Sequence, residues 1–267
     1  MFTSERVIVS GSGPSLKSID YQRIPRDINI VRVNNFFFEE NYYLGRHVDV
    51  IQFSMDRRVT RFYLSTLRDV IRQDIYSVDR IITHTNMLPP HSFPSIFQNF
   101  NFRDQKLKRM LDRLYHKNRL YPTTGVLALL NAVEHGATKI YLAGFDFYEG
   151  SEKYAFQIPP RLGSVLKPNL SEIGYDRFHS INTDLQFLKY VLDKGVEVYL
   201  TSGSVGSPFA GVGLAPKLND NAYTDMFVPK TDAQRVKDWN GRDGIYSVKF
   251  LRFGRFIFRL IKSLKYR

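Results

Sequence analysis

Two tyrosines and one histidine surround a single long connection in the second half of the chain. Tyr148 and Tyr154 follow the apolar run 139–143, and His179 stands immediately before a polar helix start. A phenol can donate a hydrogen bond to the charge that develops on a departing phosphate, and an imidazole can remove a proton from a hydroxyl at neutral pH. The three side chains therefore suit catalysis on a phosphate-bearing substrate, although each tyrosine alone also suits a core position.

The residue patterns that usually hold a catalytic metal are missing from this chain. It has no cysteine, and no two of its aspartates are separated by a single residue, so an Asp-x-Asp metal clamp is absent. The six histidines show no paired spacing of the kind that binds zinc. We therefore expect no catalytic metal and no cofactor. Tyr148 and Tyr154 are expected to meet the leaving-group charge instead.

Alternating strands and helices must position these side chains. Apolar runs predict strands at 7–9, 28–33, 48–53, 79–83, 139–143 and 196–200. Helical spacing predicts helices at 60–73 and 104–116, another from Thr123 or Thr124 to 136, and a fourth from Asn182 or Thr183 to 195. This alternation predicts an α/β fold: one Rossmann-like domain over residues 1–248, with a mostly parallel sheet flanked by helices. The long connection 149–178 is expected to form a lid.

Several polar or glycine residues follow the predicted strands directly, where ligands of such sheets bind. The first set is Gly11, Ser12 and Gly13, which would let a ligand approach the backbone closely. This loop lacks the complete pattern of a P-loop or of a dinucleotide fingerprint, so an ordinary strand-to-helix turn remains its alternative. Asn34, Ser54 and Asp146 follow three further strands. Asn34 also suits a simple turn, and Thr123, Thr124 and Gly125 also suit a simple helix cap.

Short motifs spread over residues 7–54 and 119–216 together resemble glycosyltransferase family 42, the bacterial lipooligosaccharide sialyltransferases. The carrying motifs are Gly11-Ser12-Gly13-Pro14-Ser15-Leu16-Lys17, Phe36-Phe37-Phe38-Glu39, Asn41-Tyr42-Tyr43-Leu44-Gly45, Thr123-Thr124-Gly125-Val126, Ile140-Tyr141-Leu142-Ala143-Gly144-Phe145-Asp146-Phe147-Tyr148, Tyr154-Ala155-Phe156 and His179-Ser180-Ile181-Asn182-Thr183-Asp184. Each motif is short, and their order and spacing carry the resemblance. It implies a variant GT-A fold and a metal-independent, inverting transfer from CMP-sialic acid.

The resemblance also implies a role for each candidate residue. His179 corresponds to the general base that takes the proton from the acceptor hydroxyl, and Tyr148 and Tyr154 to the pair that hydrogen-bonds the departing phosphate. The positions that correspond to nucleotide or donor contacts are Gly11, Ser12, Gly13, Asn34, Ser54 and Asp146. Thr123 and Thr124, followed by Gly125, correspond to the positions near the carboxylate of the donor sugar. Family resemblance also suggests a homo-oligomer.

From these implications we expect a sialyltransferase that acts on a terminal galactose of lipooligosaccharide or capsule glycan, with an α-2,3 linkage. Two alternatives remain open. One is transfer of another CMP-activated acid sugar. The other is a relative that binds nucleotide or membrane without catalysis, since Ser12, Ser54 and Asp176 depart from the family pattern.

The C-terminal segment 249–267 holds seven of the 38 basic residues and none of the 26 acidic ones. Six of these residues recur at helical spacing, with aromatic and aliphatic residues between them: Lys249, Arg252, Arg255, Arg259, Lys262 and Lys265. Such a basic amphipathic helix favours an anionic membrane surface, and a C-terminal helix packed on the core is the alternative. No nucleic-acid-binding module is recognisable. The absence of cysteine and of a long apolar run leads us to expect a cytoplasmic protein, attached peripherally to the inner membrane.

Overall fold

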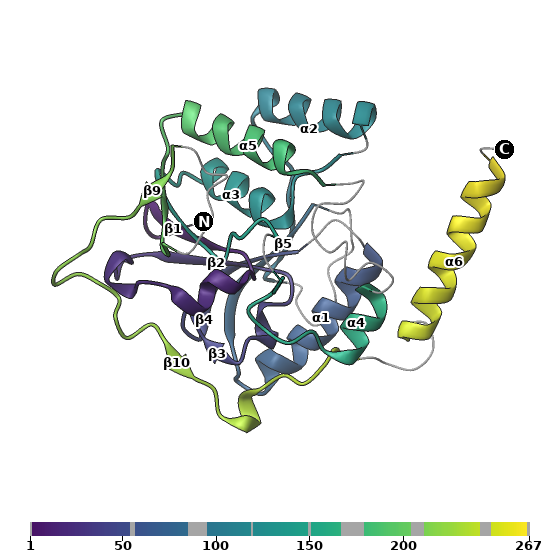
Figure 1. The fold of residues 1–267 in the computed structure, drawn as a ribbon, viewed down its shortest axis with the longest axis horizontal. Coiled ribbons are helices and arrows are strands. Elements are labelled where there is room, and N and C mark those ends of the chain that lie inside the picture. Colours follow the sequence, from purple (N-terminus) through teal and green to yellow (C-terminus); the bar gives the residue numbers. More distant parts are fainter. Residues whose placement is uncertain are drawn as a thin grey trace.

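Parallel strands form the centre of the fold in the computed structural model of the chain (Figure 1). The structure describes residues 2–53, 57–84, 95–118, 120–148, 151–166, 179–203, 211–240 and 247–265. Within these residues, eight strands pair in the order β6-β5-β4-β2-β1-β7-β8-β9, and every pairing is parallel. Their bounds are β1 Arg6–Ser10, β2 Asn29–Val33, β4 His47–Phe53, β5 Ser77–Thr83, β6 Phe97–Asn99, β7 Lys139–Ala143, β8 Glu197–Leu200 and β9 Gly213–Leu214.

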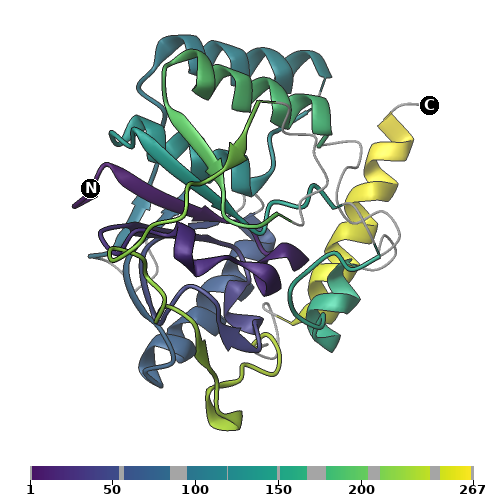
Figure 2. The same cartoon turned by 60° about the vertical axis from the view of Figure 1, so that its left-hand side comes forward.

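Helices cover both faces of this sheet (Figures 1 and 2). On one face, α3 (Thr124–Glu134) packs on β1, β2 and β4, and α5 (Ile181–Asp193) packs beside it. The helix α2 (Gln105–Asn118) adds to the same core, whereas α1 (Arg57–Arg72) packs its apolar side on the other face. The layered arrangement confirms the expected α/β fold with a parallel sheet.

The strand β1 shows why its short apolar run lies at the centre. Val7 and Val9 contribute to the core cluster beneath α3, while Ile8 points to a different cluster. Successive side chains of a strand point to opposite faces, so a strand buried on both faces needs apolar residues at every position. All three side chains are fully buried.

The predicted strands and helices lie within about three residues of their expected positions. One prediction was wrong in detail: Ser180, rather than Asn182 or Thr183, caps α5, because its hydroxyl accepts a hydrogen bond from the Thr183 amide at 3.1 Å. The sequence did not predict several short elements, namely β3 (Asn41–Tyr42), β6, β9, β10 (Val228–Pro229), α4 (Pro160–Leu166) and the 3₁₀ turns Pro14–Ser18, Tyr21–Arg23, Phe36–Phe38 and Asp232–Gln234.

The expected lid is only partly described. Residues 151–166 of the predicted 149–178 connection include α4, and the remainder of that connection lies outside the described residues. The backbone amide of Ala155 donates to the Ser12 carbonyl at 2.8 Å, so this segment joins the loop that follows β1.

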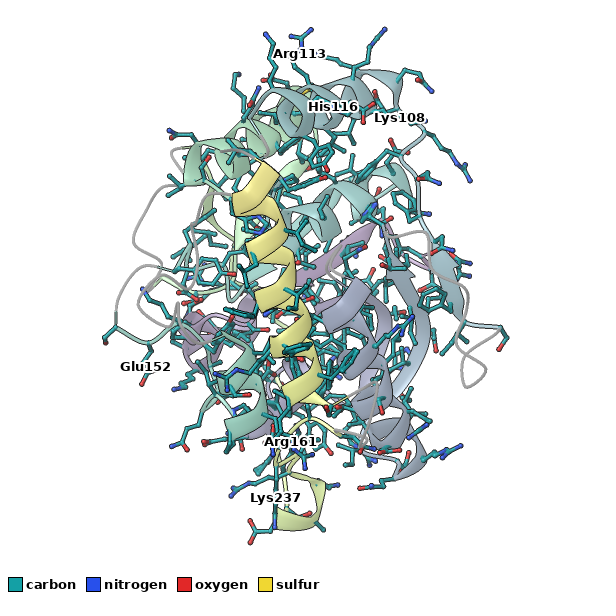
Figure 3. All side chains as sticks on the ribbon, turned by 90° about the vertical axis from the view of Figure 1, so that its right-hand side faces the viewer. Lys108, Arg113, His116, Glu152, Arg161 and Lys237 are labelled. Atoms are coloured by element: carbon teal, nitrogen blue, oxygen red, sulfur yellow. The ribbon has the colours of Figure 1, made fainter. Side chains whose placement is uncertain are left out.

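The C-terminal part of the chain returns across the body before it ends in a separate helix. Trp239 is fully buried, and its indole N–H donates to the side chain of Asn35 at 2.9 Å. The final helix, α6 (Val248–Lys265), lies at the edge of the body beside α4 (Figures 1 and 3). Arg255 of α6 donates to the Val165 carbonyl of α4 at 3.0 Å. The predicted C-terminal helix is therefore present.

Candidate active site

The candidate site lies at the point where the order of the strands across the sheet reverses. From β1 the strands continue through β2 on one side, and β7 lies on the other side of β1. The loops after β1 and β7 therefore lie next to each other at the carboxyl edge of the sheet, where ligands of such folds bind. An open pocket occupies this place, and its lining comes from the ends of β1, β2 and β7, the start of α3 and the 153–162 segment.

Close backbone contact between the loops after β1 and β7 forms the floor of the pocket. The amide of Gly11 donates to the Ala143 carbonyl at 2.9 Å, and the amide of Gly13 donates to the Gly144 carbonyl at 3.0 Å. A Cβ atom on Gly11 would lie 2.3 Å from the Gly144 oxygen, and one on Gly13 would lie 1.9 Å from the Asp146 carboxylate. Only glycine fits at these two positions.

Asp146 joins the same two loops through its side chain. One carboxylate oxygen accepts hydrogen bonds from the Ser15 amide at 3.1 Å and from the Ser15 hydroxyl at 2.9 Å. Burial raises the pKa of Asp146, while the two bonds from Ser15 act in the opposite direction. Ser12 lines the pocket beside this junction.

Asn34 lines the pocket at the end of β2 and has a positive φ of 50°. Asparagine tolerates the left-handed region better than most residues, so the position needs a residue of this type for the turn as well as for the pocket. The backbone amide of Asn34 donates to the backbone carbonyl of Gln52 at 3.1 Å. The turn and the site interpretations of Asn34 are therefore compatible.

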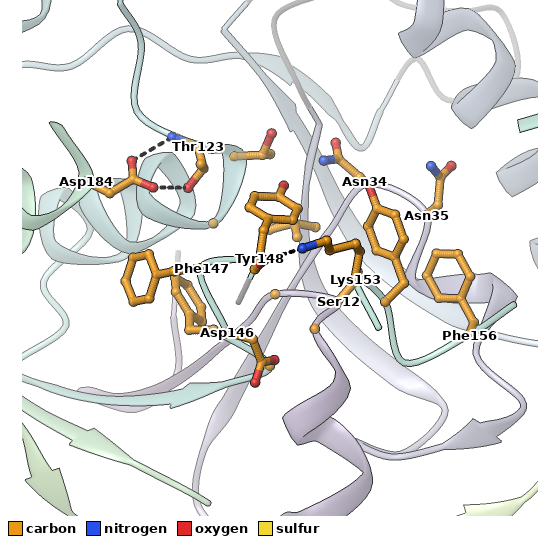
Figure 4. A pocket seen from close by; sticks show the side chains of 18 of the residues that line it. Ser12, Asn34, Asn35, Thr123, Asp146, Phe147, Tyr148, Lys153, Phe156 and Asp184 are labelled. Atoms are coloured by element: carbon orange, nitrogen blue, oxygen red, sulfur yellow. Dashed lines mark hydrogen bonds between the residues drawn. The ribbon is translucent and has the colours of Figure 1, made fainter. Parts of the chain in front are cut away.

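The two candidate tyrosines both line the pocket, at the two ends of the 148–154 segment. Phe147 and Tyr148 have consecutive positive φ angles of 47° and 59°, a strained backbone of the kind found at functional sites. The ammonium group of Lys153 donates to the Tyr148 carbonyl at 2.6 Å (Figure 4). The Tyr154 ring stacks on Phe156 at 5.1 Å, and burial raises the pKa of Tyr154 to about 12. Its phenol therefore stays protonated at neutral pH and can donate.

The starts of α3 and α5 meet at the opposite wall. Thr123 is the N-cap of α3, and its amide and hydroxyl both donate to the buried Asp184 carboxylate of α5 (Figure 4). Thr124 and Gly125 also line the pocket, and Gly125 faces the Phe145 ring, which a Cβ atom would approach to 3.0 Å. Amide groups at a helix start favour a bound anion.

His179 is half-buried just before α5 and does not line the pocket itself. Its Nδ1 lies 3.0 Å from the carbonyl oxygen of Tyr121, two residues before Thr123. Because a carbonyl only accepts, Nδ1 must carry the hydrogen and donate, which places the lone pair of the neutral ring on Nε2. This tautomer is the one that a general base acting through Nε2 requires.

The structure brings together ten of the twelve candidate site residues around this pocket: Gly11, Ser12, Gly13, Asn34, Thr123, Thr124, Gly125, Asp146, Tyr148 and Tyr154. His179 lies near its wall, and Ser54 lies outside the described residues. Sequence reasoning gave no site role to Tyr63, Asn35, Lys153, Phe156, Leu162 and Asp184, which also line it. Tyr63 could not be distinguished from the apolar set of α1, but Lys153 stands next to Tyr154 and could have been considered.

A candidate metal group lies elsewhere. In the part of the chain that the structure describes, His47, Asp49 and Asp79 form the one cluster of three side chains able to hold an ion. They belong to the first residues of β4 and β5, at the amino edge of the sheet, whereas the pocket lies at the carboxyl edge. Exposed groups of this kind are common without a metal.

Comparison with known protein families identifies one family that matches nearly the whole chain. The model of the family described as "CST-I: Alpha-2,3-sialyltransferase (CST-I)" matches residues 5–264. A search of curated protein sequences found no match.

Solved sialyltransferase structures, two of them from Campylobacter jejuni, are similar over nearly the whole chain. Monofunctional α-2,3-sialyltransferase Cst-I is 24% identical, with a TM-score of 0.79 and coverage of 98% of both chains. Sialyltransferase CstII in complex with the substrate analogue CMP-3FNeuAc is 27% identical, with a TM-score of 0.76, and covers 92% of this chain and 98% of its own. A CST-II structure in complex with a trisaccharide acceptor and CMP is also 27% identical, with a TM-score of 0.71 and coverage of 94% and 98%.

Proposed function

The chain belongs to the CST-I α-2,3-sialyltransferase family and is a glycosyltransferase, and from this premise we propose the details of its reaction. It transfers sialic acid from CMP-sialic acid to a terminal galactose of lipooligosaccharide or capsule glycan. The linkage formed is α-2,3, the configuration at the anomeric carbon is inverted, and no divalent metal takes part. The observation that carries this proposal is a pocket in which two tyrosines and two helix starts surround a pair of glycine-lined loops.

The nucleotide occupies the side of the pocket formed by the loops after β1 and β7. Gly11 and Gly13 allow the two loops to pack closely together, since a Cβ atom at either position would clash with Gly144 or Asp146, and the nucleotide lies on the floor that these loops form. Asn34 and Ser12 supply polar contacts to the donor, as does Ser54, which lies outside the described residues, in keeping with what the family resemblance implies. The start of α3, with Thr123 and Thr124, receives the carboxylate of the sugar, because its amide groups favour an anion.

Tyr148 and Tyr154 stabilise the leaving group. As the bond between the anomeric carbon and the phosphate oxygen breaks, negative charge accumulates on CMP and the sugar becomes oxocarbenium-like. The Tyr154 phenol, whose pKa is raised to about 12, remains a hydrogen-bond donor toward that charge. These two hydrogen-bonding phenols take the place of the metal ion that an Asp-x-Asp clamp would hold.

His179 acts as the general base. The acceptor hydroxyl oxygen forms the new bond to the anomeric carbon on the face opposite the phosphate, and its proton moves to Nε2 of His179. The bond from Nδ1 to the Tyr121 carbonyl holds the ring in the required tautomer. Because His179 lies beside the pocket wall rather than in the donor lining, it suits contact with an acceptor that arrives from outside.

The C-terminal helix supports attachment to an anionic membrane. Its exposed side chains are apolar and basic together: Phe250, Phe253, Phe256, Ile257, Leu260 and Ile261 are each more than a third exposed, as are Lys249 and Arg252. Among the described side chains of α6, Leu251 is buried in the body and Val248 packs against the same core cluster. Exposed phenylalanines can enter the headgroup region while lysine and arginine bind anionic lipid.

No helix in the described residues has both the length and the apolar character needed to cross a bilayer. We place the protein in the cytoplasm, at the inner membrane surface, where α6 would bring the active site to a lipid-linked acceptor. A homo-oligomer belongs to the same proposal and is supported by family resemblance alone.

Incubation with CMP-sialic acid and lactose in excess EDTA tests the function. We expect CMP and sialyl-lactose to appear in equal amounts. Release of CMP only with another CMP-activated acid sugar would assign a different donor. No CMP release with any such donor and galactose-terminated acceptor would defeat the proposal, and strict dependence on a divalent ion would contradict the metal-free mechanism.

A further inference from the structure

Among the described residues that line the pocket, Lys153 is the one with a positively charged side chain. The other two charged lining residues, Asp146 and Asp184, are acidic. A donor such as a CMP-sugar carries a negative phosphate and, for an acid sugar, a negative carboxylate. The pocket must therefore offset two further negative charges with few charges of its own.

Both acidic side chains bond to the pocket walls. Asp146 accepts from the amide and hydroxyl of Ser15 at 3.1 and 2.9 Å, and Asp184 accepts from the amide and hydroxyl of Thr123, both at 2.8 Å. These carboxylates hold loops and helix starts together. Lys153 differs from them because its charged end reaches toward Tyr148 in the pocket (Figure 4).

The position of the Lys153 ammonium group is set by its neighbours. It donates to the Tyr148 carbonyl at 2.6 Å, and Lys153 directly precedes Tyr154 in the chain. The next residue, Ala155, donates its amide to the Ser12 carbonyl at 2.8 Å, which fixes the segment against the loop after β1. The cation therefore lies in the same part of the pocket as the backbone of both candidate tyrosines.

We propose that Lys153 binds the phosphate of the nucleotide donor and is a positioning and specificity residue of the site. This inference rests on the proposed function, because it assumes a CMP-linked donor. An ammonium group has three N–H donors, and a hydrogen bond from a cation to phosphate is shorter and stronger than a neutral one. Lys153 thus adds a full positive charge to the tyrosine pair as the phosphate departs.

A purely structural role for Lys153 gives a different expectation. If Lys153 only holds the Tyr148 carbonyl, its loss disturbs the pocket for every ligand that enters the nucleotide side. If it binds phosphate, its loss weakens CMP and leaves cytidine, which has no phosphate, unaffected. The ratio of the two affinities separates the two roles.

Calorimetric titration of CMP and cytidine into four full-length proteins tests the inference. Lys153→Gln should weaken CMP binding about tenfold or more and change cytidine binding less than about twofold, since one charge-assisted bond is removed. Lys153→Arg keeps the charge and should retain most of the preference for CMP. Lys17→Gln is the matched control, because Lys17 is an exposed lysine that pairs with Glu152 at 2.9 Å outside the pocket lining.

Each outcome decides between the possibilities. Equal CMP affinity of the wild type and Lys153→Gln overturns the inference while leaving the proposed function intact. Equal losses for CMP and cytidine also overturn it, in favour of the structural role. Failure of the wild-type protein to bind CMP would overturn both the inference and the proposed function.

Discussion

Thr123 and Asp184 join the starts of two helices through two hydrogen bonds. The backbone amide of Thr123 donates to one oxygen of the Asp184 carboxylate and its hydroxyl donates to the other, both at 2.8 Å. Thr123 caps α3 and Asp184 lies in the first turn of α5, only five residues after His179. The pair therefore links the wall of the donor pocket to the segment that carries the proposed base. Asp184 is almost completely buried, so its bonds are protected from water.

Replacement of this carboxylate tests the link. Asp184→Asn keeps the shape but places an amide nitrogen where one of the two bonds was accepted, and it should destabilise the protein by about 1–3 kcal/mol. Transfer activity should fall as well, since His179 loses its position. The midpoint of urea unfolding and kcat measure the two effects. Asp193→Asn, at an exposed position near the end of the same helix, should change neither; equal behaviour of the two variants would refute the role of the pair.

The loop after β1 gives a steric prediction. Gly13→Ala places a methyl group 1.9 Å from the Asp146 carboxylate, so the loop must move and the contact between Asp146 and Ser15 must break. We expect a loss of about 1–3 kcal/mol in stability and a clear loss of CMP affinity. Gly213→Ala is the control, because nothing lies within 4 Å of a Cβ there. Normal CMP affinity of Gly13→Ala would show that the loop does not form the nucleotide side.

His84 gives a pH dependence of stability that is independent of catalysis. It packs between Phe100 and Phe102, and burial lowers its pKa from 6.5 to about 4. Between these values the unfolded chain binds more protons than the folded one, so stability falls as the pH drops from 6.5 to 4 and levels off below.

The expected loss from His84 is about 3 kcal/mol at most, since one pKa unit corresponds to about 1.4 kcal/mol. Urea unfolding at several pH values in this window measures it, with His84→Phe as the comparison. Phenylalanine suits the aromatic surroundings and has no group to titrate, so the variant should be less sensitive to acid. An unchanged pH slope would place the origin of the acid sensitivity elsewhere.

The exposed phenylalanines of α6 give a prediction for membrane binding. The double change Phe253→Ser and Phe256→Ser removes two side chains that are 61% and 59% exposed, and it should reduce binding to vesicles that contain anionic lipid at least tenfold. Transfer to soluble lactose should stay the same. Leu214→Ser serves as the control, because it removes an exposed apolar side chain that lies outside α6.

Truncation near residue 246 should have the same effect on vesicle binding as the double change, while hydrolysis of the donor persists. Unchanged vesicle binding in both variants would eliminate α6 as the membrane contact.

The strands and most helices could be predicted from local pattern, because strands buried on both faces read as short apolar runs. A run such as Val7, Ile8 and Val9 strongly favours a strand that is buried on both faces. The convergence of Gly11, Asn34 and Asp146 was also predictable, since parallel strands place their carboxyl ends at one edge. Family resemblance, rather than the pattern, supplied their assigned roles.

Contacts between distant segments could not be predicted in this way. The two-residue strands β3 and β10 have no periodicity to detect, and they exist because Tyr42 and Val228 pair across the fold. Lys153 stands next to Tyr154 in the sequence, but a sequence position beside a candidate residue does not show that the lysine side chain lines the pocket. The cap of α5 was misplaced because Ser180, Asn182 and Thr183 are all good cap residues, and the choice depends on a single hydroxyl contact.

The most direct test of the central claim is an NMR time course of the reaction with CMP-sialic acid, lactose and EDTA, run in parallel for the wild-type protein and His179→Ala. The wild type should form CMP and α-2,3-sialyl-lactose in equal amounts, with inversion at the anomeric carbon. His179→Ala should lose at least about a hundredfold in rate while it still binds CMP. Undiminished transfer by His179→Ala would rule out this histidine as the general base, and a product that retains the donor configuration would rule out an inverting transfer.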